Sequence, residues 1–256
     1  MEIAVLIKHV PSTESAVDIA DGGVAVKTDG MTWVMNPYDE MAVEEALKIR
    51  TAAGGSVTVF TLGPEKSVEA LRTALAMGAD TAVRIDPEGK SLDSLGVARV
   101  LAGELKKGAF DLVIAGHRAV DDDAFQVGPA VAEFMGIPHI SMVIAEEIAD
   151  GRIRCTRTVE GGTLVLESPL PALITTQRGL NEPRYASLPG IMKAKKKPID
   201  TRLVSTTGTD PGEPIVRVIG LHLPPVRKPG QMVDGDSAAA KAASLVRALR
   251  EDARVI

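Results

Sequence analysis

The alternation of short apolar runs with amphipathic segments in the first 140 residues is the feature that most constrains the fold. The runs are EIAVLIKHV, SVTVFTL, ADTAVRI and FDLVIAG, each short and rich in branched aliphatic side chains. This pattern is typical of strands that are buried on both faces. Strands that alternate with helices are joined by right-handed crossovers. The pattern therefore predicts an α/β fold with a doubly wound, mostly parallel sheet over about residues 1–140.

The segments between these strands carry helix boundary signals. NPYDEMAVEEALKIR begins with acidic residues and ends with basic ones, which suits the helix dipole. GPEKSVEALRTALAMG has Pro64 at its start and Gly78 at its end, and SLDSLGVARVLAGELKKG is stopped by Gly108. A fourth helix is predicted from about Gly128 to Met135. Helices should therefore cover both faces of the sheet.

The pattern changes after residue 140. ISMVIAEEIADG, RIRCTRTVEGG, TLVLESP and PALITTQ read as consecutive strands with glycine-containing turns, which predicts an antiparallel extension over about 141–197. Residues 198–236 are rich in Pro, Gly and Thr and predict an extended arm with at most a short strand at IVRVIGLHL. A last helix, SAAAKAASLVRALRED, is too short to be stable alone and should pack on this chain or on a partner. We expect residues 1–197 to form the α/β domain and residues 198–256 the arm and helix.

Composition limits the function classes. Aromatic residues make up 3% of the chain, so the core must be aliphatic, and the formal charge of −5 argues against general nucleic-acid binding. A single cysteine, Cys155, excludes an intrachain disulfide and offers no cysteine metal cluster. No apolar run reaches the roughly 18 residues of a spanning helix. MEIAVLIKHV carries an acid, Glu2, and no basic region ahead of its apolar run, so we expect a strand, not a signal peptide, and a cytoplasmic, bacterial-type location.

The stretch AVDDDAFQVGP joins the fourth predicted strand to the helix that follows. Open parallel sheets bind ligands at the carboxyl ends of their strands, where this loop should lie. Pro129 lacks an N–H group and fits the first turn of a helix, which fixes the helix start near Val127 or Gly128. The backbone N–H groups of Gln126, Val127 and Gly128 should then be free. Free amides at a helix N-terminus form a ready anion site.

The three adjacent acids of this loop, Asp121 to Asp123, allow four interpretations. A magnesium site has no other hard ligands at motif spacing to support it. Acid–base chemistry lacks a recognisable partner, because His117 alone proves little. One acid could cap the helix while the others are solvated, or an acid could accept hydrogen bonds from a ribose. The sequence contains neither of the glycine-rich phosphate-binding motifs, G-x-x-x-x-G-K-S/T or G-x-G-x-x-G after a strand. From the residues alone, the sequence predicts an α/β domain with an anion site after its fourth strand.

Three stretches taken together resemble the β subunits of electron transfer flavoproteins: MNPYDEMAVEEALKIR, LRTALAMGAD and LNEPRYASLPGIMKAKKKPI. The resemblance spans nearly the whole chain and implies a Rossmann-like fold of the adenine-nucleotide-hydrolase type. It further implies a heterodimer with an α subunit that holds most of the redox FAD and is embraced by the arm, residues 198–256. Such carriers take electrons from soluble dehydrogenases, often acyl-CoA dehydrogenases of fatty acid β-oxidation, and pass them to a membrane quinone oxidoreductase. The β subunit is then an electron-transfer carrier subunit, not an enzyme.

The resemblance also places a nucleotide site at four points of this chain. These are the end of the first strand, the start of the first helix, the turn after the second strand and the loop that opens the fourth crossover. Tyr38 matches an aromatic position close to the partner's flavin ring. No catalytic or metal-binding residue is expected. The expected cofactor-binding residues are Leu6, Lys8, Asn36, Pro37, Tyr38, Asp39, Leu62, Gly116, His117, Arg118, Ala119, Val120, Asp121, Asp122, Asp123, Ala124, Phe125, Gln126, Val127 and Gly128.

The nucleotide expected at this site depends on the branch of the family. The respiratory branch holds a structural AMP there, whereas a bifurcating branch holds a second FAD. The respiratory branch usually has Asn-Gln-Thr-Gly where this chain has FQVG, and QVGP resembles the bifurcating branch. Asp122 stands where that branch tends to have Gly, and Glu160-Gly161-Gly162 resembles the respiratory one. We favour AMP, with a second FAD as the alternative and a stand-alone ATP-binding enzyme as a further one.

The segment ASLPGIMKAKKK places apolar side chains beside a run of lysines. A lysine run is ordinarily a solvated face, and nucleic-acid binding lacks both basic net charge and stacking aromatics here. In the resembling family this segment is a recognition loop whose exposed leucine enters an apolar pocket on the dehydrogenase. Leu188 occupies that position. The expected partner-binding residues are Leu188, Pro189, Ile191, Met192, Lys193, Lys195 and Lys196.

Overall fold

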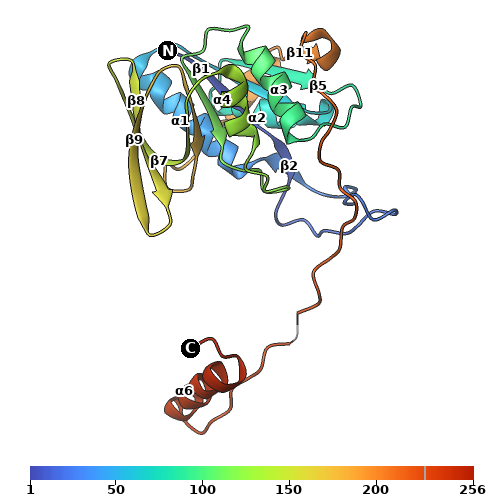
Figure 1. The fold of residues 1–256 in the computed structure, drawn as a ribbon, viewed down its shortest axis with the longest axis vertical. Helices are drawn as coiled ribbons and strands as arrows, with labels where there is room; N and C mark the ends of the chain where they lie inside the picture. The colour runs from blue at the N-terminus through green and yellow to red at the C-terminus, as the bar shows by residue number, and fades with distance from the viewer. Residues whose placement is uncertain (228) are drawn as a thin grey trace.

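A computed structural model describes residues 1–227 and 229–256. Its central feature is a nine-stranded sheet in the order β11-β5-β4-β1-β6-β10-β7-β8-β9 (Figure 1). The middle strands β1 (Glu2–Leu6), β4 (Ser56–Leu62), β5 (Thr81–Asp86) and β6 (Leu112–Gly116) are mutually parallel. Their apolar side chains are buried, as the short aliphatic runs predicted. The predicted α/β class with a mostly parallel sheet is confirmed.

Helices cover both faces of this sheet (Figure 1). The helices α1 (Pro37–Ala53) and α2 (Val68–Met77), the latter preceded by the short η1 (Glu65–Ser67), bury their apolar stripes in one core cluster. The helices α3 (Ser94–Leu105) and α4 (Val127–Met135) form a second cluster on the opposite face. The Asp93 carboxylate accepts the Gly96 N–H group at 2.9 Å and so caps α3. The doubly wound arrangement is therefore confirmed.

The first predicted strand is divided in two. EIAVLIKHV does not run through as one strand: β1 ends at Leu6, and β2 (His9–Pro11) pairs antiparallel with β3 (Trp33–Met35) in a separate two-stranded sheet. The cause lies at Lys8, whose N–H donates to Asp39 Oδ2 at 2.7 Å and whose carbonyl accepts the Asn36 N–H at 2.9 Å. These bonds turn the backbone out of the main sheet toward the start of α1.

The antiparallel extension is shorter than predicted. It consists of β7 (His139–Ala149), β8 (Arg152–Val159) and β9 (Gly162–Pro169), but β10 (Ala172–Thr176) does not belong to it. Instead β10 lies parallel to both neighbours between β6 and β7. Its five residues are all buried, unlike those of the half-exposed extension strands, as expected for a strand in the centre of a parallel sheet.

The C-terminal arm begins within the sheet. The strand β11 (Asp200–Leu203) pairs parallel with β5, and η2 (Val204–Thr206) follows it. The short strand expected at IVRVIGLHL is not formed, because residues 215–223 have irregular backbone. There the arm is tied down by backbone groups, with the Ile215 N–H donating to Asp93 Oδ2 at 2.8 Å and the Leu221 N–H to the Gly23 carbonyl at 2.7 Å.

The helix α6 (Ala238–Arg247) and the short π-helix η3 (Ala248–Asp252) stand apart from the body in Figure 1. Neither element has a buried residue, and Leu245 and Val246 are exposed. The predicted packing partner of α6 is therefore not found among the described residues of this chain. Within the described ranges, no helix is long and apolar enough to cross a membrane.

Candidate functional site

The candidate site lies at the carboxyl edge of the central strands, where β1, β6 and β10 end beside the N-termini of α1 and α4. Register brings these ends together, because Leu6 is paired with Ala115 and Thr176 with Gly116. In an open parallel sheet this edge is where ligands bind. Nearly all the cofactor-binding residues predicted from the sequence lie on these ends and on the loop after β6.

A buried polar pair joins the start of α1 to the loop. The Asn36 side chain donates to Asp39 Oδ1 and to the Arg118 carbonyl, both at 2.9 Å, and accepts the Val120 N–H at 3.2 Å. Asp39 also accepts the N–H groups of Lys8 and of Gly116. Both side chains therefore bind the protein's own backbone and position the loop.

Burial raises the pKa of Asp39 to about 7, although the three donors around it favour the ionised carboxylate. The crowding at this point explains the glycine that ends β6. A Cβ atom added at Gly116 would lie 2.3 Å from Asp39 Oδ1 and 2.8 Å from Tyr38 Cβ. The close approach of α1 to β6 thus requires a residue without a side chain here.

The three acids of the loop form ion pairs with two basic side chains of this chain. Lys8 Nζ donates to Asp121 Oδ1 at 2.8 Å and to Asp122 Oδ2 at 2.9 Å, and Arg118 Nη1 donates to both oxygens of Asp123 at 2.9 Å. The interpretation of one acid as a helix cap is wrong. The N-cap residue of α4 is Gln126, and it has no side-chain cap bond, because ion pairing holds the acids upstream.

The N-terminus of α4 begins at Val127, where Pro129 in the first turn had placed it. The N–H groups of Gln126, Val127 and Gly128 have no hydrogen-bond acceptor among the described residues, whereas the Ala130 N–H bonds back to the Gln126 carbonyl. Lys8 and Arg118 lie close by, and both are paired with the three carboxylates of the loop. It is the free amides of the helix N-terminus that make this edge able to hold an anion.

Aromatic and cationic side chains cluster beside this point. Tyr38 and His117 meet edge to face with ring centroids 4.1 Å apart, and His117 lies 5.4 Å from Phe125. Arg118 donates to the Tyr38 hydroxyl at 3.0 Å and lies over its ring. Burial lowers the pKa of His117, which keeps the imidazole neutral near pH 7 while one ring nitrogen contacts the Thr176 carbonyl at 2.9 Å. The cluster offers flat apolar surface next to positive charge.

One predicted residue lies apart, and two contributors were missed. Leu62 ends β4 at the same sheet edge but packs against the core cluster of α3 and α4. Thr176 donates to the Tyr38 carbonyl at 2.8 Å, and Arg178 lies over the Tyr38 ring. Both follow from the insertion of β10 beside β6, and the only sequence signal was the polar end of PALITTQ.

The predicted recognition segment forms a helix, α5 (Leu188–Lys196), capped by the Ser187 hydroxyl, which accepts the Gly190 N–H. Leu188 and Met192 are 79% and 60% exposed, and Lys193, Lys195 and Lys196 of the same helix are exposed as well. The segment is nevertheless anchored, because Arg72 of α2 donates to the Lys197 carbonyl at 2.6 Å. The result is a firmly held helix with apolar side chains facing outward.

The fold and this edge define a doubly wound α/β protein whose sheet ends beside the free backbone amides of a helix N-terminus. In the part of the chain that the structure describes, no group of three or more His, Cys, Asp or Glu side chains is placed to hold a metal ion. The model of the electron transfer flavoprotein domain matches residues 24–206.

Relatives match over the whole length. The chain is 40% identical to the electron transfer flavoprotein subunit beta of Bacillus subtilis (strain 168) over 100% of both chains. It is 38% identical to that of Syntrophomonas wolfei over 92% of this chain and 91% of the relative. With the human subunit beta it shares 36% identity over 91% of this chain and 93% of the relative. The chain belongs to the electron transfer flavoprotein family, and its similarity is to the β subunits.

Proposed function

We propose that this chain is the β subunit of a heterodimeric electron carrier. It docks an α subunit that holds most of a redox FAD, takes electrons from acyl-CoA-type dehydrogenases and delivers them to a membrane quinone oxidoreductase. It catalyses no reaction on its own and works in the cytoplasm. The arm, residues 198–256, embraces the α subunit, which accounts for the exposed apolar side chains of α6. The FAD supplies the one- and two-electron chemistry.

The residues of the loop after β6 fit a structural AMP. The observation that carries this proposal is the set of free amides at Gln126, Val127 and Gly128, beside Lys8 and Arg118. The amides would hold the phosphate, and the carboxylates of Asp121 and Asp122 have acceptor capacity for ribose hydroxyls. In this structure those carboxylates bind Lys8, so a phosphate would compete with them for its ammonium group.

The proposal is tested by counting nucleotides in the purified heterodimer. One FAD and one AMP per heterodimer are expected. In Lys8→Gln, AMP retention should fall by at least about tenfold while FAD stays, since a charge-assisted hydrogen bond contributes about 1.5–3 kcal/mol. Lys27→Gln is the matched control, because Lys27 forms a similar exposed pair with Asp18 at 2.9 Å. A heterodimer that carries FAD and lacks AMP would refute the AMP assignment.

A bifurcating subunit with a second FAD is the other candidate. QVGP at the start of α4 favours it, as does the 47% exposed Phe125 ring beside His117, which offers a surface for a flavin ring. Two FAD per heterodimer and no AMP would support this candidate. ATP turnover by the chain alone would instead indicate a stand-alone enzyme.

A further inference from the structure

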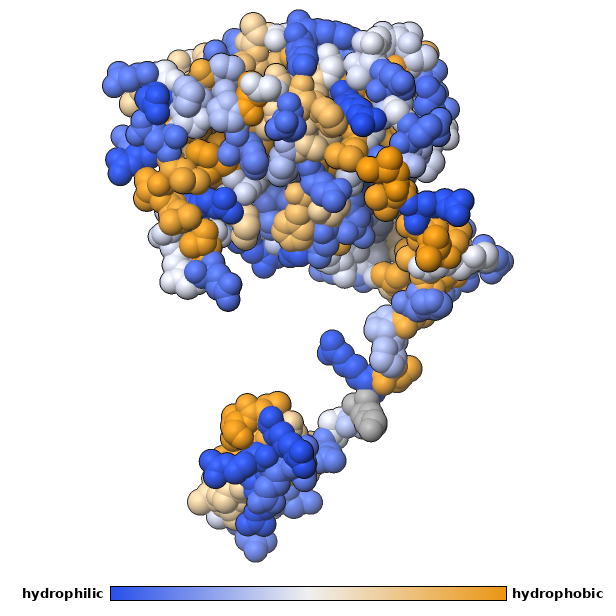
Figure 2. Space-filling model, viewed as in Figure 1, coloured by the Kyte–Doolittle hydropathy of each residue, from blue (hydrophilic) through white to orange (hydrophobic). Residues whose placement is uncertain are grey.

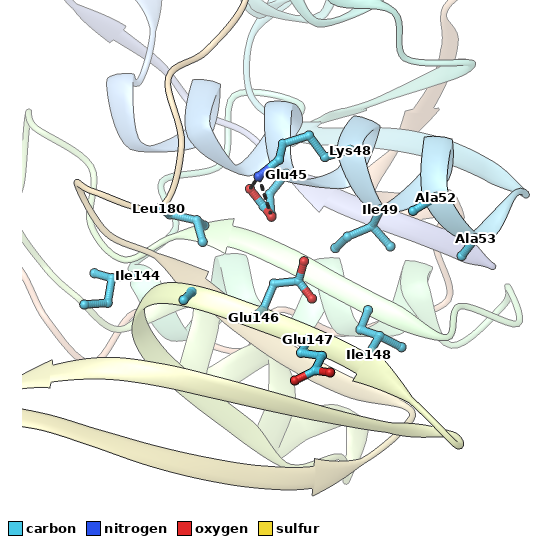
Figure 3. A pocket seen from close by; sticks show the side chains of 11 residues that line it. Glu45, Lys48, Ile49, Ala52, Ala53, Ile144, Glu146, Glu147, Ile148 and Leu180 are labelled. Carbon is cyan, nitrogen blue, oxygen red and sulfur yellow. Dashed lines mark hydrogen bonds and ion pairs between the residues drawn. The ribbon is translucent and has the colours of Figure 1, made fainter.

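A trough of about 500 Å³ lies on the side of the sheet that α1 covers, away from the loop after β6. Ile49 and Ala52 of α1, Ile148 of β7 and Leu180 supply apolar walls (Figure 3). Two carboxylates face each other across it: Figure 3 shows Glu146 of β7 pointing toward Glu45 of α1. Burying carboxylates between apolar walls costs free energy of folding unless an opposite charge pairs with them.

The two carboxylates differ in their partners. Glu45 is buried and is satisfied, because Lys48 Nζ lies 3.1 Å from Oε2 and Asn181 donates to the same oxygen at 2.6 Å. Glu146 forms no ion pair in the described part of the chain, and its side-chain hydrogen bond is to the Glu45 carboxyl group. Three carboxylates, Glu45, Glu146 and Glu147, line the trough against the single positive charge of Lys48. The trough therefore carries an excess of negative charge.

The apolar surface continues beyond the trough along the same sheet face. Glu146 is paired with Cys155 on β8, and Cys155 with Leu166 on β9, so these three side chains form a row across the extension. Leu166 and Leu164 are exposed on the edge strand. Figure 2 shows apolar surface gathered over the antiparallel strands. A footprint of this extent, open to the surface, suits a protein partner better than a small molecule.

We propose that this trough receives an arginine side chain of the α subunit, whose guanidinium binds the Glu146 carboxylate. The aliphatic stem of an arginine would lie along Ile49 and Ile148. Its planar fork of donors matches the two oxygens of a carboxylate, which the single ammonium of lysine does not. The proposal rests on the heterodimer of the proposed function and adds a specific anchor to it.

The titration of Glu146 provides a signature. Burial, and next the adjacent Glu45 carboxylate, raise the pKa of Glu146 to about 7. The other charged groups around it are Lys48, Glu147 and Cys155, and burial raises the pKa of the Cys155 thiol to about 12, so that thiol stays neutral. A guanidinium favours the ionised carboxylate and lowers its pKa. Association should therefore strengthen as pH rises through 7.

The experiment measures subunit exchange between tagged and untagged heterodimers by native mass spectrometry. Glu146→Gln should exchange at least about tenfold faster than wild type at pH 8, because a buried, hydrogen-bonded charge pair mainly sets the dissociation rate. Glu147→Gln is the matched control, because the side chain of Glu147, next to Glu146 in the chain, points away from α1 in Figure 3. The exchange rate of this variant should stay within about twofold of the wild-type rate. Wild-type exchange should slow between pH 6 and pH 8, and Glu146→Gln should lose this dependence.

Replacing the arginines of the α subunit one at a time identifies the occupant. One of these replacements should accelerate subunit exchange when the β subunit is wild type and have no further effect when the β subunit carries Glu146→Gln. Equal exchange rates for Glu146→Gln and wild type, or no such arginine, would overturn the inference while leaving the heterodimer intact. A wild-type chain that forms no heterodimer at all would instead refute the proposed function, and the inference with it.

Discussion

Asn36 and Asp39 act through the backbone that they hold. They fix the carbonyl of Arg118 and the N–H groups of Lys8, Gly116 and Val120, all at the edge where β1 and β6 end. Buried polar groups that are fully hydrogen-bonded specify one arrangement of the chain. The ends of two strands and the loop after β6 are thereby set in fixed positions before any ligand arrives.

Gly116 tests how tightly this arrangement is packed. Gly116→Ala should lower the free energy of unfolding by about 1–3 kcal/mol, because its Cβ would overlap Asp39 and the Tyr38 side chain. Gly162→Ala is the control, since no atom lies within 4 Å of the added Cβ there. Urea denaturation of the two variants measures the difference. Equal stability would mean that α1 moves away from β6 at little cost.

Asp39 should make stability depend on pH in an unusual direction for a carboxylate. Its folded-state pKa of about 7 exceeds the ordinary 3.8, so the folded state binds the proton more tightly than the unfolded state does. The stabilisation of the folded state by proton binding to Asp39 is complete below pH 3.8 and is lost as pH rises through about 7. Unfolding free energies at pH 5 and pH 8 should therefore differ more in wild type than in Asp39→Asn. Parallel profiles would show that the three donors keep Asp39 ionised.

At the scale of elements, local signals predicted most of the fold. β4 and the start of α4 lie where apolar runs and Pro129 placed them. The failures were of two kinds. The end of β1 depends on Asp39, which is distant in sequence. The position of β10 depends on its pairing with β6, and the order of strands along the chain does not reveal that pairing.

The candidate site divides in the same way. Position in the sequence indicated the free amides of α4, because a proline marks the first turn of a helix. The partners of the acids could not be predicted, since Lys8 and Asp121 meet only after β1 and β6 pair. Thr176 and Arg178 were missed for the same reason.

The helix α5 carries the element-scale prediction. Leu188→Ala should slow reduction of the heterodimer by its dehydrogenase by about tenfold and leave flavin content unchanged, because an exposed leucine among lysines suits a small apolar anchor. Leu203→Ala, at an exposed leucine of β11, is the control. Stopped-flow absorbance of the flavin reports both. An unchanged rate would remove Leu188 from the docking surface.

At the scale of the whole molecule, α6 stands apart from the body (Figure 1) and has no buried residue. A chain that ends at Asp236 should unfold with the same free energy as the full chain to within about 0.5 kcal/mol, because α6 buries no residue. Its heterodimer should dissociate faster, since the exposed face of Leu245 and Val246 would be lost. Chemical denaturation and subunit exchange measure the two quantities. Lower stability of the truncated chain alone would place α6 on its own body.

The bare apolar side of α6 also has a consequence for synthesis. A copy without its partner subunit would expose aliphatic side chains to chaperones and proteases until that subunit covered them. Surplus copies should be cleared quickly, so the abundance of this polypeptide would follow that of its companion. Matched production of the two would then be enforced by degradation as well as by transcription.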